Sequence, residues 1–212
     1  MAFYGVNPSN LENAITNVNS AYADLYTAIL NTSSTYMSGL AACWGNKNGK
    51  DFGEDLERTI NQFLKNVTKV FDSVNDSMNS AGKIWNRNNG DGSFSPVGFN
   101  SKNGDIQNTI RTAMPNGDEG LDEAIVNSET ETYMNDLASK VSEAVVAAKQ
   151  AVSNTGFLGG GQEAALQNSI SSIASQVDEI EAKIASEVSK ITGKNIESSV
   201  KCAQLVTDGF SG

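Results

Sequence analysis

Few side chains of this 212-residue chain could carry chemistry. The chain has no histidine, and its two cysteines are Cys43 and Cys202. Without an imidazole it cannot assemble a Ser-His-Asp triad, a Cys-His nucleophile or a histidine-ligated zinc site. Two cysteines cannot form a zinc ribbon or a disulfide framework, and the sequence leaves open whether they pair with each other. We therefore expect neither an enzyme nor a bound cofactor.

Three other groups of residues point only weakly to a ligand. Gly159-Gly160-Gly161 precedes a helix and could hold an anion, but it lacks the Lys-Ser/Thr pair of a phosphate loop. Asp178, Glu179 and Glu181 have no histidine partner for a di-iron site, and we interpret them as a solvated face. Residues 86–91 lack the glutamate that closes a calcium loop. The sequence therefore predicts no metal site.

The chain is strongly acidic, and the acidity lies in its second half. Fifteen Lys and Arg oppose 25 Asp and Glu, a formal net charge of -10. Residues 113–212 carry six of the basic and fifteen of the acidic residues. This balance argues against sequence-independent nucleic-acid binding, which requires a basic face. An acidic helix face is usually only solvated, but it could also dock a basic partner.

Apolar residues near the N-terminus recur at alternating spacings of four and three, the heptad pattern of a helix that packs along one face. Pro8 suits a first helical turn, and Ser9 with Glu12 matches a capping box. The pattern predicts a helix from about residue 8 to about residue 42. Its apolar face comprises Leu11, Ile15, Val18, Tyr22, Leu25, Ile29, Tyr36 and Leu40.

A turn is expected at residues 43–50, where two glycines and two asparagines interrupt the pattern. Asp51 and Glu54 match a second capping box, and the heptad pattern resumes. We expect a second helix from about residue 51 to about residue 85, antiparallel to the first because the connection is short. Its apolar face comprises Phe52, Leu56, Ile60, Phe63, Val67, Val70, Val74, Met78, Ala81 and Trp85.

Residues 86–117 are rich in Asn, Gly and Pro and predict an irregular linker, in which Asp105 could cap a short helix ending near Met114. The pattern of helix, turn and helix then repeats, with a glycine-rich turn at 154–161. Thr192-Gly193 indicates a helix end, followed by a short last helix at about 195–207. The apolar residues of this half are Leu121, Ile125, Met134, Leu137, Val141, Val145, Ala148, Val152, Leu166, Ile170, Ile173, Val177, Ile180, Ile184, Val188, Ile191, Ile196, Val200 and Leu205.

The sequence thus predicts an all-α protein, in which two antiparallel helical hairpins form an elongated four-helix bundle. The first hairpin is expected at residues 1–85 and the second at 118–212, with the linker at 86–117. A two-helix hairpin buries too little surface to be stable alone, so the two hairpins are expected to pack against each other. The spacing leaves open whether the bundle closes within one chain, as a monomeric pseudo-dimer, or in a homodimer.

The first hairpin resembles the Trp-X-Gly family, the early-secreted-antigen-like substrates of bacterial type VII secretion. Trp44 takes the position of the family's tryptophan, Gly45 lies beside it in the turn, and Phe52 is the aromatic residue eight positions later. In the second hairpin, Phe157 and Gly159 keep the spacing of the motif with phenylalanine in place of tryptophan. The chain therefore resembles two such hairpins fused in tandem.

The chain departs from the family pattern at two places. The family's glycine lies two residues after the tryptophan, where this chain has Asn46. The family's export signal is a tyrosine followed four residues later by an acidic residue, just past the second helix. Trp85 stands near that place, but Asn89 occupies the acidic position. Trp85 therefore marks only a candidate signal region.

The resemblance implies a non-enzymatic protein of the type VII pathway that is exported from the cytoplasm, with the secretion ATPase and a co-secreted protein as expected partners. The N-terminus lacks a basic segment and an apolar core, so we expect no cleavable signal peptide. One alternative is a cytoplasmic helical chaperone or adaptor for a basic or toxin partner. Another is a membrane-active amphipathic helical protein, which the acidic polar faces do not favour.

Overall fold

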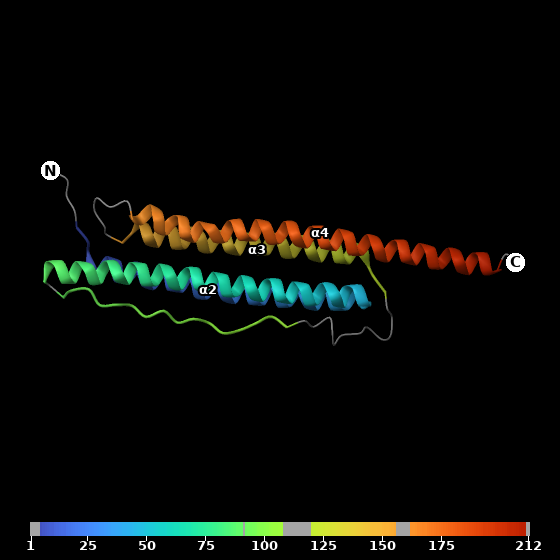
Figure 1. Ribbon diagram of the computed structural model, residues 1–212, viewed down its shortest axis with the longest axis horizontal. Coiled ribbons are helices and arrows are strands. Elements are labelled where there is room, and N and C mark those ends of the chain that lie inside the picture. The colour runs from blue at the N-terminus through green and yellow to red at the C-terminus, as the bar shows by residue number, and fades with distance from the viewer. Residues whose placement is uncertain (1–4, 91, 108–119, 156–161, 211–212) are drawn as a thin grey trace. The chain divides into compact units, whose positions relative to one another are not determined.

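The computed structural model describes residues 5–90, 92–107, 120–155 and 162–210, and these contain four helices. The helices are α1 (Pro8–Cys43), α2 (Lys47–Asn89), α3 (Glu123–Ser153) and α4 (Gln162–Phe210) (Figure 1). The described residues contain no strand, and one isolated bridge joins Trp44 to Leu121. The predicted all-α four-helix bundle is therefore confirmed.

The chain divides into two compact units, and each unit takes a part of all four helices. The first unit comprises Met1–Asn31, Asn61–Asp105 and Asp136–Asp178, and the second comprises Thr32–Ile60, Ile106–Asn135 and Glu179–Gly212. Each unit has its own buried apolar residues from several helices. The boundary between the units therefore crosses the helices, and neither helical hairpin forms a unit by itself.

In the first unit, hydrogen bonds between side chains identify the helices that neighbour each other. Asn75 on α2 donates to Asn19 on α1, and the hydroxyls of Tyr22 and Thr68 lie 3.0 Å apart. Asn66 on α2 donates to Gln176 on α4, and Gln167 on α4 donates to Ser153 on α3. Early residues of each helix pair with late residues of the next, so these neighbours are antiparallel.

In the second unit, too, the helices joined by hydrogen bonds are antiparallel. Ser33 and Tyr36 on α1 make hydrogen bonds of 2.8 and 2.6 Å with Tyr133 and Thr130 on α3. Lys183 on α4 donates to Thr59 on α2. Each hydroxyl pair is buried, because the rings of Tyr36 and Tyr133 stack at 4.4 Å between the helices. Burial raises the pKa of both phenols well above the usual value, so both stay protonated.

The predicted apolar faces are largely confirmed, and all eight predicted residues of α1 are buried. The prediction is wrong at Ile125, which is 46% exposed, whereas Val126 is fully buried. It is also wrong on the last part of α4, where Ile196, Val200 and Leu205 are 38%, 61% and 65% exposed. It is also displaced at Val70 and Met134, where the adjacent aromatic residue is the more buried one: Phe71 and Tyr133. Where two apolar residues are adjacent, heptad spacing alone does not fix the phase of the helix, and the larger ring buries more area.

The N-terminal caps of α1 and α2 differ from the prediction, and both are asparagines. Asn7 rather than Ser9 caps α1, since its side-chain oxygen accepts from the amide of Asn10 at 3.1 Å. Asn46 caps α2, which begins at Lys47, four residues before the predicted start at Asp51, and its side-chain oxygen accepts from the amide of Gly49 at 3.0 Å. Both predicted capping boxes are therefore wrong.

Two further boundaries differ from the prediction. α4 continues through Thr192-Gly193 to Phe210, so no helix ends at Gly193 and no separate last helix exists. A glycine inside a helix costs only about 1 kcal/mol relative to alanine, which a long packed helix tolerates. α2 extends to Asn89, and residues 105–107 are not helical. The rest of the short helix predicted to end at Met114 lies outside the described residues.

Candidate interaction site at the Trp44 turn

The turn between α1 and α2 comprises Trp44, Gly45 and Asn46, and it is built around a buried indole. The Trp44 side chain is 0% exposed, and its ring stacks on Phe52 with the centroids 5.4 Å apart. The two aromatic residues that the resemblance singled out are therefore in contact. Since a buried ring covers apolar area at the end of a helix pair, Trp44 stabilises the turn from inside.

A buried indole N–H must have an acceptor, and Asn46 supplies it. Trp44 Nε1 donates to Asn46 Oδ1 at 3.1 Å, and the same oxygen accepts from the amide of Gly49. Leaving a buried donor unpaired costs about 1–3 kcal/mol, so this contact is needed if the ring is to stay buried. Asn46 stands where the family has its glycine. Its side-chain oxygen both caps α2 and accepts the hydrogen bond of the Trp44 indole.

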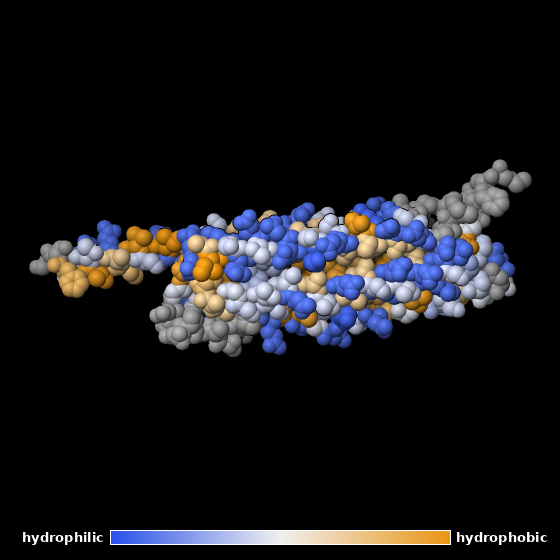
Figure 2. Space-filling model, turned by 180° about the vertical axis from the view of Figure 1, so that it is seen from behind, coloured by the Kyte–Doolittle hydropathy of each residue, from blue (hydrophilic) through white to orange (hydrophobic). Residues whose placement is uncertain are grey.

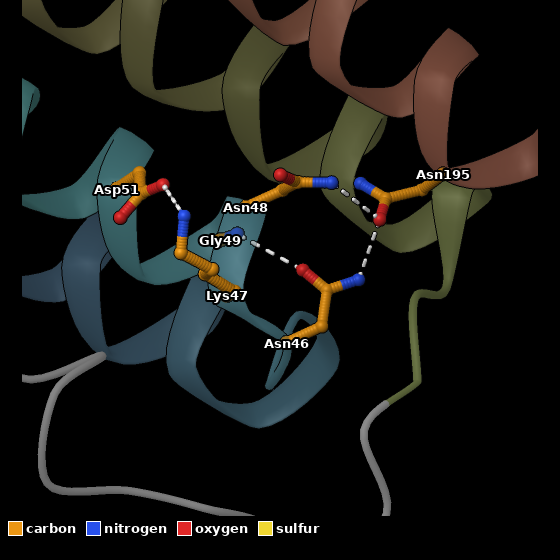
Figure 3. Close-up of polar contacts among 6 residues, drawn as sticks. All are labelled: Asn46, Lys47, Asn48, Gly49, Asp51 and Asn195. Carbon is orange, nitrogen blue, oxygen red and sulfur yellow. Dashed lines mark hydrogen bonds and ion pairs between the residues drawn. The ribbon is translucent and has the colours of Figure 1, made fainter. Parts of the chain in front are cut away.

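The amide of Asn46 also connects the turn to α4. Its Nδ2 donates to Asn195 Oδ1 at 2.7 Å, and Asn48 Nδ2 donates to the same oxygen at 2.9 Å (Figure 3). Asn195 Nδ2 in turn donates to the carbonyl of Ile191 at 3.0 Å. The orientation of each amide is therefore fixed by a partner, and three asparagines join two helices.

The glycine that the buried indole requires is Gly49. A Cβ placed on Gly49 would lie 2.5 Å from the carbonyl oxygen of Trp44 and 2.8 Å from two indole carbons. Gly45 has a different role: its amide donates to the carbonyl of Gly120 at 3.2 Å. The positive φ angles of the described glycines belong to Gly90 and Gly92, so Gly45 does not reverse the chain through a left-handed conformation.

Backbone pairing attaches the start of α3 to this turn. The amide of Asp122 donates to the carbonyl of Cys43 at 2.9 Å, beside the bond from Gly45 to Gly120. The carboxylate of Asp122 then caps α3 by accepting from the amide of Ile125 at 3.1 Å. One short stretch of backbone therefore fixes the end of α1 against the beginning of α3.

The other predicted site residues lie away from this turn or outside the described part of the chain. Phe157 and Gly159 belong to residues 156–161, which the structure does not describe. Trp85 is half-buried in the last turn of α2, inside the helix and not past its end. Its Nε1 is buried and has no hydrogen-bond partner among the described residues.

Sequence reasoning missed Asn48, Gly49 and Asn195 as parts of the site. The turn composition marked Asn48 and Gly49 only as helix breakers, and Asn195 interrupts an apolar face on α4 without any local motif. A polar residue at a core-facing heptad position was the one available signal, because such a residue needs a partner when buried. Which partner it finds depends on the packing of α4 against the turn.

The described residues offer little for other kinds of site. No described helix is long and apolar enough to cross a membrane. Over the same residues, no three Asp, Glu or Cys side chains gather closely enough to hold a metal ion. The chain matches no family model, no curated protein and no solved structure. The resemblance to the Trp-X-Gly family therefore depends on the turn residues alone.

Replacing glycine with alanine should have opposite effects on the free energy of unfolding at two helical positions, Gly49 and Gly193. Gly49→Ala places a methyl group against Trp44 and should lower the free energy of unfolding by about 1–3 kcal/mol, as overpacking does. Gly193→Ala, whose Cβ would meet nothing, should raise it by up to about 1 kcal/mol. Urea denaturation followed by circular dichroism measures both. A loss of stability in Gly193→Ala would show that Gly193 ends a helix, contrary to the continuous α4.

The two free cysteines should differ sharply in reactivity. Burial, with the nearby carboxylates of Glu129 and Asp122, raises the pKa of the Cys43 thiol to about 11, whereas Cys202 is exposed. Because the thiolate is the reactive species, Cys43 stays protonated and unreactive at pH 7–9. A thiol reagent at pH 8 should label Cys202 alone, and Cys43 only in denaturant. Rapid labelling of a folded Cys202→Ser variant would contradict this assignment.

Proposed function

We propose that the chain is a substrate or secretion partner of a type VII secretion system and acts through helix–helix contacts, without catalysis. The observation that carries the proposal is the turn between α1 and α2, in which Trp44 is buried, stacked on Phe52 and hydrogen-bonded to Asn46. A hairpin turn organised around a tryptophan is what the resemblance implies for a family member.

Because Trp44 is buried, a secretion ATPase could not bind the indole directly. Because the indole is fully buried, the ATPase would contact the surface that the indole supports. Two charged side chains occupy that surface at the start of α2: Lys47, which is 88% exposed, and Asp51, which is 57% exposed. Their ion pair spans 3.3 Å, and an exposed pair of this kind contributes little to stability. These side chains are therefore available for recognition.

The fused form of the two hairpins supports export as a monomeric pseudo-dimer over a homodimer. Each compact unit contains parts of all four helices of one chain, and the hydrogen bonds between helices satisfy polar groups within that chain. A second copy is therefore not needed to complete either core. The proposed partners are the secretion ATPase and a co-secreted protein, with export from the cytoplasm to the outside of the cell.

Export should depend on the secretion ATPase and on the charge at the turn. We expect the chain in the culture medium of a strain with the ATPase and not of a strain without it. Lys47→Glu should reduce export several-fold because it reverses an exposed charge beside the turn. Lys190→Glu, which breaks a similar exposed ion pair with Glu187, is the control and should be exported normally. Equal extracellular amounts in both strains would refute the proposal.

A second candidate function is a helical adaptor, and the C-terminal part of α4 favours it. Every residue from Ile196 to Phe210 is exposed, and Figure 2 shows hydrophobic side chains on this surface. Ile196, Val200, Ala203 and Phe210 recur at helical spacing on one face, and the exposed Leu205 lies on the opposite face with Ser198. An amphipathic helix of this kind fits an apolar groove on another protein.

The adaptor function predicts a stable complex that depends on this face of α4. Val200→Glu should abolish co-purification of the chain with one defined cellular protein, because it places a charge in the apolar contact. Ser198→Glu adds the same charge on the opposite face and should leave the complex intact. Both residues are exposed, so neither change should alter the melting temperature. Equal recovery of that protein with both variants would exclude this face as the contact.

A further inference from the structure

An extended segment, residues 93–105, lies along α1 and α2 in the first unit, and we call it the strap (Figure 1). It contains no helix or strand, so its backbone groups need partners elsewhere. Side chains of the two helices supply many of them. We call these side chains, together with Gly82, the strap site: Glu12, Asn19, Tyr22, Tyr26, Asn75, Asn79 and Asn86.

On α2, two asparagines each bind both backbone groups of one strap residue. Asn86 donates to the carbonyl of Phe94 at 2.7 Å and accepts from its amide at 3.0 Å. Asn79 does the same for Val97, with both distances 2.8 Å, and Asn75 donates to the same carbonyl. A paired donor and acceptor on one side chain reproduces the way a neighbouring strand would bind.

On α1, four side chains bind further backbone groups of the strap. Glu12 accepts from the amide of Ser95 at 2.6 Å, and Asn19 donates to the carbonyl of Gly98 at 3.1 Å. The hydroxyl of Tyr22 accepts from the amide of Lys102 at 2.9 Å. The remaining hydroxyl, that of Tyr26, binds both the amide and the carbonyl of Gly104.

The spacing of the strap site matches the repeat of an extended chain. Asn79 and Asn86 are seven residues apart, or about 10.5 Å along a helix. Their partners Phe94 and Val97 are three residues apart, or about 10 Å along an extended chain. Glu12 and Asn19 repeat the same relation with Ser95 and Gly98. Heptad spacing on each helix therefore matches a three-residue interval in the first half of the strap, whereas Lys102 and Gly104 do not follow this interval.

Few strap side chains take part in this recognition. Phe94 is 3% exposed, and a Cβ placed on Gly82 would overlap its ring, so Gly82 forms the pocket for an aromatic side chain. Phe99 packs on Tyr22 with the ring centroids 4.8 Å apart. The remaining strap residues are exposed or half-buried. The strap site therefore binds an extended backbone with aromatic side chains at two positions, of which only Phe94 is fully buried.

We expect the strap to open at a lower cost in free energy than a helix of the bundle. The side chains beneath the strap are largely amides, hydroxyls and one carboxylate, which water can hydrate. The strap also follows Gly90 and Gly92, whose φ angles of 67° and 56° favour glycine and mark a bend between α2 and the strap. A segment with one fully buried side chain, held largely by hydrogen bonds to its backbone, belongs to the low-stability end of local opening.

We propose that the strap site is a binding site for an extended segment of a partner protein, with an aromatic side chain in the Gly82 pocket, and that the strap is its resident competitor. The partner segment would bind mainly through its backbone amides and carbonyls, so binding would not require charged side chains on that segment. The proposal is independent of the secretion pathway, since it depends only on contacts within the first unit.

A labelled peptide of residues 93–105 tests the proposal by fluorescence anisotropy with the full chain. The variant Phe94→Ser removes the anchor of the strap and leaves the strap site intact. We expect it to bind the peptide at least about tenfold more tightly than the wild-type chain, because the strap competes and lowers the binding-competent fraction. The double variant Phe94→Ser, Gly82→Ala should lose this binding, since the new methyl group fills the aromatic pocket.

A second measurement covers the case in which Phe94→Ser does not fold. Gly82→Ala alone should displace Phe94 and speed trypsin cleavage at Lys102 several-fold, while circular dichroism stays unchanged because alanine favours a helix. Peptide binding that is equal with and without Gly82→Ala would overturn the proposal. So would the absence of peptide binding by a folded Phe94→Ser chain, or unchanged cleavage in Gly82→Ala.

Discussion

The need to satisfy one buried indole N–H organises the end of the second unit. The ring of Trp44 is fully buried, and a nearby side chain must therefore accept its hydrogen bond. Asn46 does so, and because its oxygen also accepts from the amide of Gly49, the same contact begins α2. The amide nitrogen of Asn46 is then left to find an acceptor, which α4 provides as Asn195. The burial of one ring thus fixes a turn, a helix start and the register of a distant helix.

Asparagine serves the same purpose in both units, where it joins segments that are far apart in the sequence. At the Trp44 turn, asparagines bind one another and the backbone of α2 and α4. At the strap site, Asn79 and Asn86 bind the backbone of an extended segment. Each side-chain amide has a donor and an acceptor at a fixed distance. It can therefore make the hydrogen bonds that a backbone peptide group of a neighbouring strand or helical turn would make. These polar contacts add to the apolar side chains that all four helices bury.

The helices and most of their buried faces could be predicted from the sequence, because heptad spacing is a local property. All eight residues predicted on α1 are buried, from Leu11 to Leu40. The helix starts could not be predicted as well. Ser9 and Asp51 had the right composition for caps, but Asn7 and Asn46 occupy the position where the chain turns. Gly193 failed as a stop signal because local propensity is weak compared with the packing of a long helix.

The strap and the Asn195 contact could not be predicted, since both join residues far apart in the sequence. The composition of the linker correctly predicted an irregular segment. No local sequence pattern indicated that Asn79 and Asn86 would bind it. Asn195 now connects two features of the second unit. It binds the turn at Asn46 and Asn48, and the exposed apolar part of α4 begins at the next residue, Ile196. Asn46 therefore links the packing of Trp44 to the position of α4 just before its exposed part.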